Sequence, residues 1–138
     1  LRDRRGHVGF RPMTPAWLQG TGPTLWMEWF FAYAILHAVA DYSLQTDFMA
    51  RGKNRHAPFT SECSLPAKTL WIYCLTSHAL VHAGGVWLVS GRVGFALAEF
   101  VLHWLIDWAK IERKMDFHTD QALHLACKAA YVAVAVAA

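Results

Sequence analysis

The sequence predicts an all-α fold, a four-helix transmembrane bundle, from its composition and from the length of its apolar runs. Hydrophobic residues make up 55% of the 138-residue chain and charged residues only 17%, against about 25% charged in a typical soluble domain. Four segments stay apolar over close to the roughly 20 residues that a helix needs to cross a bilayer. Only helices and closed barrels satisfy their backbone in lipid, and these runs are too long for barrel strands.

Residues 1–23 are expected to be a polar N-terminal tail, and residues 24–138 a single four-helix membrane domain. The tail is rich in Gly and Pro and has no helical period. The first apolar run follows this polar segment and is too long for the core of a secretory signal, so no cleavable signal peptide is expected. A chain of this length suits one domain.

The first helix is expected over residues 24–44, which are apolar except for a few polar positions. One of these, Glu28, lies near the start of the run and is expected at the membrane interface. A polar connection follows over residues 46–67, where two prolines limit helix formation.

The second helix is expected over residues 68–91, the third over 93–109 and the fourth over 120–138. Gly84 and Gly85 lie within the second run, where small residues let two membrane helices approach closely. Since a residue or two separates the second and third runs, these helices should form a tight antiparallel hairpin. The fourth run is rich in Ala and other small residues.

Each predicted helix carries one pair of metal-capable side chains spaced i,i+4. The pairs are His37 with Asp41, His78 with His82, His103 with Asp107, and Asp120 with His124. Residues four apart lie on one face of a helix, so both members of a pair can reach one ion. Three pairs lie at helix ends that face the 46–67 and 110–119 connections, and the fourth lies somewhat deeper. The sequence therefore predicts that the eight side chains converge on one buried, polynuclear site.

The ligand set suits zinc, iron or manganese, because it combines imidazole and carboxylate without thiolate. The expected cofactor is zinc, with two or more ions, and iron or manganese is the alternative. Such a zinc site can generate hydroxide near neutral pH and hold both oxygens of a phosphoester. The expected function is a membrane-embedded metal-dependent hydrolase acting on a phosphoester or lipid-derived substrate, with Asp107 and Glu99 as candidate catalytic groups. The alternatives for Glu99 are a metal ligand, a partner that orients a ligand, or a position too far toward the opposite leaflet to reach the site. The alternative is a non-enzymatic integral membrane protein, a subunit or a proton or ion pathway, with a structural His/Asp network.

Other polar residues have weaker expected roles. The amides of Gln45 and Gln121 could orient metal ligands from a second layer, and Lys128 could neutralise a carboxylate. Three basic residues of the 46–67 connection could hold a phosphate or lipid headgroup: Arg51, Lys53 and Arg55. The alternative for these three is ordinary loop charge at an anionic membrane surface. The basic residues lie outside the apolar runs except Lys128, so no nucleic-acid partner is expected.

The order of these motifs resembles the DUF3307 family of bacterial and phage membrane proteins. The motifs are H-x3-D at His37, LQTD at Leu44, H-x3-D within HWLID at His103, and DQ-x2-H at Asp120, and the resemblance covers about residues 30–130. It implies an integral membrane protein with the lipid bilayer as partner, expected in a bacterial inner membrane. More remotely, the H-x3-D pairs are similar to those of membrane-bound metal-dependent hydrolases, zinc-dependent phospholipase C and P1 nuclease. That similarity implies zinc, although the N-terminal Trp ligand of the last two enzymes has no match here.

Overall fold

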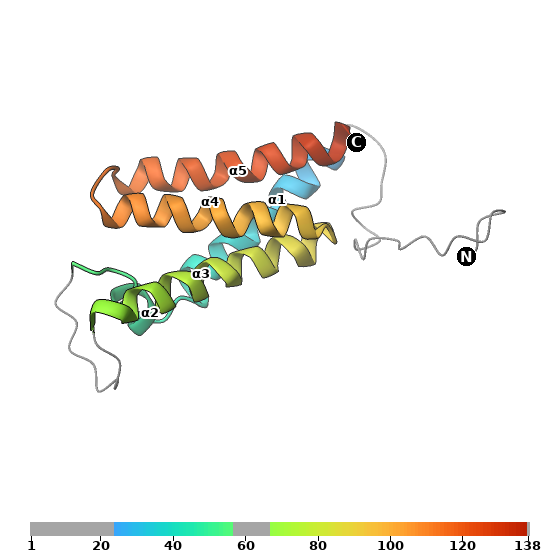
Figure 1. Ribbon diagram of the computed structural model, residues 1–138. Coiled ribbons are helices and arrows are strands. Elements are labelled where there is room, and N and C mark those ends of the chain that lie inside the picture. Colours follow the sequence, from blue (N-terminus) through green and yellow to red (C-terminus); the bar gives the residue numbers. More distant parts are fainter. Residues whose placement is uncertain (1–23, 57–66, 138) are drawn as a thin grey trace, which may run out of the picture.

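The computed structural model describes residues 24–56 and 67–137, and its regular structure there is helical throughout (Figure 1). The elements in chain order are α1 (Leu25–Ala38), the π-helix η2 (Val39–Ser43), α2 (Asp47–Gly52), α3 (Ala67–Ser90), α4 (Val93–Ile111) and α5 (Phe117–Ala137). The four long helices pack in the cyclic order α1, α3, α4, α5, so that each contacts two neighbours, and the short α2 packs against α3. The expected tail, residues 1–23, lies outside the described residues.

The four long helices correspond to the four apolar runs, with differences at three places. A π-helical turn, η2, continues α1 through the end of the first run. Within the 46–67 connection α2 forms because Thr46 caps it, its hydroxyl oxygen accepting the Met49 amide hydrogen at 3.2 Å. The fourth helix begins at Phe117 instead of residue 120, because the Asp116 carboxylate accepts the Thr119 amide at 2.7 Å and so caps an additional first turn.

The α3–α4 hairpin has the two-residue connection that the sequence predicts. α3 ends at Ser90, and Gly91 adopts a left-handed φ of 65° while its amide donates to the Trp87 carbonyl at 2.7 Å. This conformation costs glycine nothing and satisfies a carbonyl at the helix end. Because the connection is short, it fixes which side chains of α3 and α4 lie at the same level along the bundle axis.

The interior near the start of α1 and the end of α5 is aromatic and apolar. Its buried core consists of Trp29, Tyr33, Val86, Tyr131 and Val132. The Tyr33 ring packs edge-on against both Trp29 and Tyr131, at centroid distances of 6.1 and 6.2 Å. These contacts join α1, α3 and α5 at that end of the bundle.

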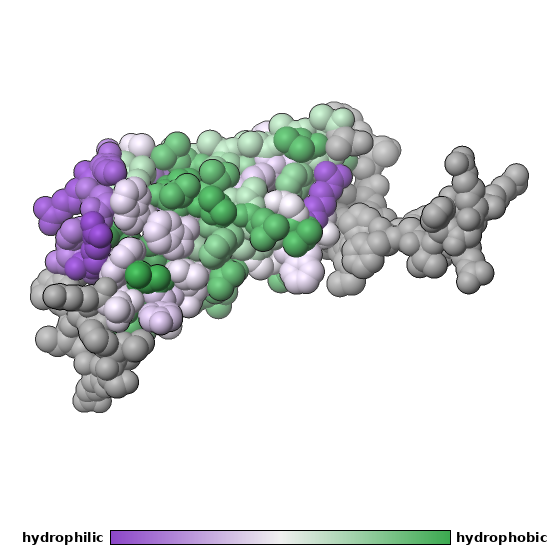
Figure 2. All heavy atoms as spheres, in the orientation of Figure 1, coloured by the Kyte–Doolittle hydropathy of each residue, from purple (hydrophilic) through white to green (hydrophobic). Residues whose placement is uncertain are grey.

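Hydrophobic residues also cover the outside of the bundle. Figure 2 shows them over its middle, with hydrophilic residues gathered at the end that carries the α4–α5 connection. Among the described residues, one helix is long and apolar enough to cross a membrane, over Thr69–Ser90 in α3. One such helix by itself is compatible with a membrane protein and with the core helix of a soluble protein. α4 carries Glu99, Asp107 and Lys110 within its 19 residues, which lowers its apolar character.

Candidate metal centre

The eight metal-capable side chains all point into the half of the bundle nearer the α4–α5 connection. Seven of them are buried, and Asp41 is partly exposed: the buried ones are His37, His78, His82, His103, Asp107, Asp120 and His124. They come from α1, η2, α3, α4 and α5, so every long helix contributes. The i,i+4 spacing places both members of a pair on the inward face of their helix.

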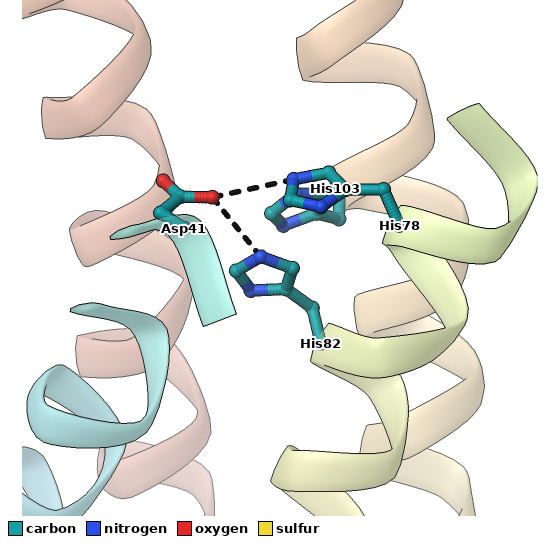
Figure 3. Close-up of side chains that lie close together, drawn as sticks. All are labelled: Asp41, His78, His82 and His103. Atoms are coloured by element: carbon teal, nitrogen blue, oxygen red, sulfur yellow. Dashed lines mark hydrogen bonds and ion pairs between the residues drawn. The ribbon is translucent and has the colours of Figure 1, made fainter. Parts of the chain in front are cut away.

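Asp41 is the centre of a first group of side chains. One of its carboxylate oxygens, Oδ1, lies 3.1 Å from His82 Nε2 and 3.2 Å from His78 Nε2. Figure 3 shows the carboxylate facing both rings, with His103 alongside His78. The ligand atoms of these four residues all lie within 4.8 Å of one another. Asp41 belongs to η2, and π-helical turns are frequent at functional sites.

Asp107 is the centre of a second group. Its Oδ1 lies 3.4 Å from His124 Nε2 and 3.9 Å from His103 Nε2, and the ligand atoms of these three residues are again within 4.8 Å of one another. The two groups share His103, whose ring stacks at centroid distances of 3.7 Å on His82 and 4.1 Å on His124. The two neighbouring groups thus share one imidazole, and because an imidazole nitrogen has a single lone pair, His103 can bind an ion in only one group at a time through that nitrogen.

The two remaining predicted ligands lie at the edge of these groups. His37 Nε2 is 3.3 Å from Asp41 Oδ2, and Asp120 Oδ1 is 3.6 Å from His124 Nε2. Neither His37 nor Asp120 belongs to one of the two groups whose ligand atoms lie within 4.8 Å of one another. The structure therefore brings six of the eight predicted side chains into ligand groups and sets the other two against them.

Several buried imidazole nitrogens face carboxylates without forming a hydrogen bond. Among the described residues, the Nε2 atoms of His78, His103 and His124 have no hydrogen-bond partner, although carboxylate oxygens lie 3.2–3.9 Å away. An imidazole lone pair and a carboxylate oxygen are both acceptors, so their close approach is unfavourable unless a proton or a cation lies between them. Buried polar atoms in native structures are nearly always satisfied. A cation in each group would give these nitrogens a partner, His78 in the Asp41 group and His124 in the Asp107 group, with His103 binding one of the two ions.

Glu99 lies behind His103 and is fully buried. Its Oε1 accepts a hydrogen bond from His103 Nδ1 at 3.2 Å and pairs with the Lys128 ammonium, which is also buried. A proton held on Nδ1 leaves Nε2 of the same ring free to bind a metal. Glu99 is not among the residues that line the pocket described next. Its position fits a group that orients His103, which is one of the roles that the sequence left open for Glu99.

The two glutamines lie beside the carboxylates. Gln121 Nε2 donates to Asp41 Oδ2 at 3.1 Å, and its Oε1 accepts from His37 Nε2 at 3.4 Å. The Gln45 oxygen accepts from Lys53 Nζ at 3.1 Å. Gln121 thus contacts two predicted ligands directly, as expected for a second layer, whereas Gln45 reaches the cluster through a lysine.

A pocket of about 290 Å³ opens beside the cluster at the polar end of the bundle. The carboxylates that line it are Asp41, Asp107 and Asp120, and its cationic lining includes Lys53, Lys110 and Arg113. Lys53 Nζ lies 2.7 Å from Asp107 Oδ2, and Lys110 Nζ lies 2.6 Å from Asp120 Oδ2. The pocket therefore joins predicted metal ligands to positive charge.

The structure separates the three basic residues that were expected to hold a headgroup. Lys53 lines the pocket. Arg51 pairs with Asp47 at 2.7 Å on the surface, and Arg55 pairs with Glu112 at 2.8 Å. Lys110 was missed as a site residue, because the sequence was interpreted as placing it among membrane-flanking charges. Its position three residues after Asp107, on the same helical face, is the signal that could have indicated it.

These features define an all-helical bundle protein with a buried His/Asp cluster that opens to a polar pocket. The family model for DUF3307, described as a protein of unknown function, matches residues 29–138, and the chain belongs to this family. No curated protein and no solved structure matches the chain.

Proposed function

We propose that this protein is a membrane-embedded, metal-dependent hydrolase that acts on a phosphoester or lipid-derived substrate, with zinc bound by the His/Asp cluster. The observation that carries the proposal is the set of three buried imidazole nitrogens, on His78, His103 and His124, that face carboxylates without hydrogen bonds. Without a metal, each of these nitrogens is satisfied only if it carries a proton directed at a carboxylate, and otherwise costs about 1–3 kcal/mol as an unsatisfied buried group. The adjoining pocket gives a substrate access to the same carboxylates.

The distribution of polar and apolar residues supports a location in the lipid bilayer. The interior of one half is polar, whereas large hydrophobic side chains are exposed on all four long helices, including Phe31, Ile35, Tyr73, Leu88, Leu97, Val101 and Val134. Soluble monomers rarely expose contiguous apolar surface on this scale. Apolar residues on the helix faces away from the polar pairs are also exposed, namely Val39, Leu80, Val81, Leu102 and Leu105, and Leu36 is half-buried. A bacterial inner membrane is the proposed location.

The proposed chemistry assigns separate tasks to the chain's own residues. The Asp41 group and the Asp107 group provide two places for an ion, and His103 can give its Nε2 to an ion in either one. Divalent ions held there would lower the pKa of a bound water and stabilise negative charge on a phosphoester. Glu99 keeps His103 in the tautomer that presents Nε2. Asp41 and Asp107 each lie both in a ligand group and in the pocket lining, and Asp107 also pairs with Lys53, so the proposed reaction depends most on these two carboxylates.

The test is the metal content of the full chain, purified in detergent with metal-free buffers. We expect at least one zinc, iron or manganese ion per chain in the wild type, and loss of that metal in His103→Ala. The matched control is His118→Ala, which removes an exposed histidine on α5. Two results would favour the non-enzymatic alternative, in which the polar groups hold the helices together or relay protons. One is wild-type protein without stoichiometric metal, and the other is a His103→Ala variant that keeps its metal.

A further inference from the structure

Two of the cationic side chains that line the pocket pair with carboxylates at or beside the proposed metal site. Lys53 pairs with Asp107, a member of a ligand group, and Lys110 pairs with Asp120 beside it. Lys53 is well shielded, with a side-chain exposure of 15%, whereas the Lys110 side chain is 34% exposed. When a divalent ion neutralises Asp107, Lys53 loses most of its attraction to that carboxylate, while Lys110 keeps Asp120, which lies outside the ligand groups. A shielded ammonium without a counter-charge is unfavourable, so Lys53 then requires another anion, and Lys110 lines the same pocket.

The charges around the pocket indicate how negative that anion must be. Three carboxylates and three cationic side chains line it and balance one another: Asp41, Asp107 and Asp120, with Lys53, Lys110 and Arg113. Each divalent ion adds two positive charges that nothing in this set compensates. A phosphomonoester carries about −1.5 to −2 at neutral pH, whereas a diester carries a single charge. A monoester dianion therefore matches the loaded site better than a diester does.

The size of the pocket limits how much of a substrate it can enclose. Its volume of about 290 Å³ is at the lower limit of the ~300–1,000 Å³ typical of small-molecule sites. A phosphate with a short part of its alcohol fits, and the rest of the molecule must lie outside. Recognition then depends on the terminal phosphate, which a lipid headgroup or a soluble metabolite can supply equally well.

From the lysine pairing, the charge and the volume, we infer that the pocket is a phosphomonoester site in which Lys53 and Lys110 bind the non-bridging phosphate oxygens. The inference rests on the proposed hydrolase function and names its substrate class. In the reaction the oxygen of a water forms a new bond to phosphorus, and the ester bond between phosphorus and the alcohol oxygen breaks. One proton of the water passes to that oxygen, so the products are the free alcohol and inorganic phosphate. Lys53 and Lys110 act as binding residues in this scheme.

The test compares Lys53→Met and Lys110→Met with Arg51→Met in the zinc-loaded, detergent-purified chain. Arg51 is the matched control, because it is a cation of the same region that pairs with Asp47 on the surface and does not line the pocket. Inorganic phosphate binding is measured by calorimetry. Hydrolysis is measured on phenyl phosphate and on its diphenyl diester. Metal content is measured in every variant, so that loss of phosphate binding is separated from loss of the metal.

We expect the wild type to bind inorganic phosphate and to hydrolyse the monoester in preference to the diester. Each lysine variant should bind phosphate about ten- to a hundredfold more weakly, since each loses a hydrogen bond between charged groups. Arg51→Met should match the wild type, and all three variants should keep their metal. Lys53→Arg and Lys110→Arg should retain binding within a few-fold, which separates loss of charge from misfolding.

The outcomes distinguish the phosphomonoester site from the proposed hydrolase function on which it rests. Full metal content with a preference for the diester, or with unchanged phosphate binding in both lysine variants, overturns the phosphomonoester site and leaves the hydrolase proposal standing. Absence of metal from the wild type overturns both. Activity on a phosphomonoester lipid in mixed micelles but not on phenyl phosphate identifies the source as a headgroup, and the reverse identifies a soluble ester.

Discussion

The two halves of the bundle interior are built from the same helices but differ in what holds them together. Near the start of α1 and the end of α5, the rings of Tyr33 and Tyr131 pack with apolar neighbours, although both hydroxyl groups have no hydrogen-bond partner among the described residues. Nearer the α4–α5 connection the interior holds His103, Asp107 and their partners, several with unsatisfied atoms. Dispersion and packing stabilise the first half at any ionic condition. The stability of the second half depends on bound ions and on protonation. A change of pH or of metal concentration should therefore act on this half and leave the first half unaffected.

The largest expected effect is that of Asp107→Asn in the polar half. The substitution removes one charge with little change in volume, from a residue that joins a ligand group and pairs with Lys53. We expect metal affinity and any phosphoester hydrolysis to fall by more than the ~10–100-fold typical of changes to residues that merely support metal ligands. Circular dichroism should show unchanged helix content, because the apolar half still packs. If Asp107→Asn protein kept its full metal content, metal binding in the polar half would not depend on this carboxylate, and the prediction would be wrong.

The next effect in size concerns the boundary between the halves, where Glu99 pairs with Lys128. Lys128→Met leaves a buried carboxylate without its counter-charge, which costs about 3–5 kcal/mol in comparable cases. Unfolding in detergent should show this loss whether or not metal is present. The double variant Glu99→Gln/Lys128→Met should recover much of the stability while its metal affinity stays reduced, because His103 has lost its carboxylate partner. A Lys128→Met variant as stable as the wild type would show that this pair contributes nothing.

A smaller effect tests helix packing away from the polar cluster, at two neighbouring glycines of α3. A Cβ at Gly85 would collide with the Leu36 side chain of α1, whereas one at Gly84 meets nothing within 4 Å. Gly85→Ala should therefore destabilise the protein by about 1–3 kcal/mol through overpacking. Gly84→Ala should be neutral or stabilise by up to ~1 kcal/mol through helix propensity. The melting temperatures of the two variants are measured with and without a chelator, and each should shift from the wild-type value by the same amount in both conditions. A shift that depends on the chelator would show that helix packing at this position is coupled to metal binding.

The smallest effect lies at the polar surface, where Arg55 and His56 contact Glu112. The hydrogen bond from Arg55 is the main cause that lowers the pKa of Glu112 below its ordinary value of 4.5. A carboxyl group whose pKa is lowered by folding contributes stability above its ordinary pKa, and this contribution is lost as the pH falls. Melting temperature measured from pH 6 to about pH 3 should thus fall slightly less steeply in Glu112→Gln than in the wild type. Identical slopes would show that this ion pair is fully screened.

The sequence by itself determined the helices and their inward faces. The four apolar runs, the two-residue α3–α4 connection and the i,i+4 pairs such as His103 with Asp107 depend on local periodicity, which the order of residues fixes. The convergence of these pairs was predictable as well, because a buried polar group in one helix requires a partner from another. The short α2 was not anticipated, although the Thr46 cap that starts it was available in the sequence.

Only the tertiary structure decided which cation meets which carboxylate. Lys53 reaches Asp107, whereas Arg51, two residues earlier on the short α2, turns to the surface and pairs with Asp47. Glu99 lies behind His103 with Lys128 and away from the pocket, a placement that depends on how α4 and α5 are rotated against each other. Pairings of this kind join residues as far as 57 positions apart. Helix rotation and loop path set them, and neither is encoded in the local periodicity that makes a helix recognisable.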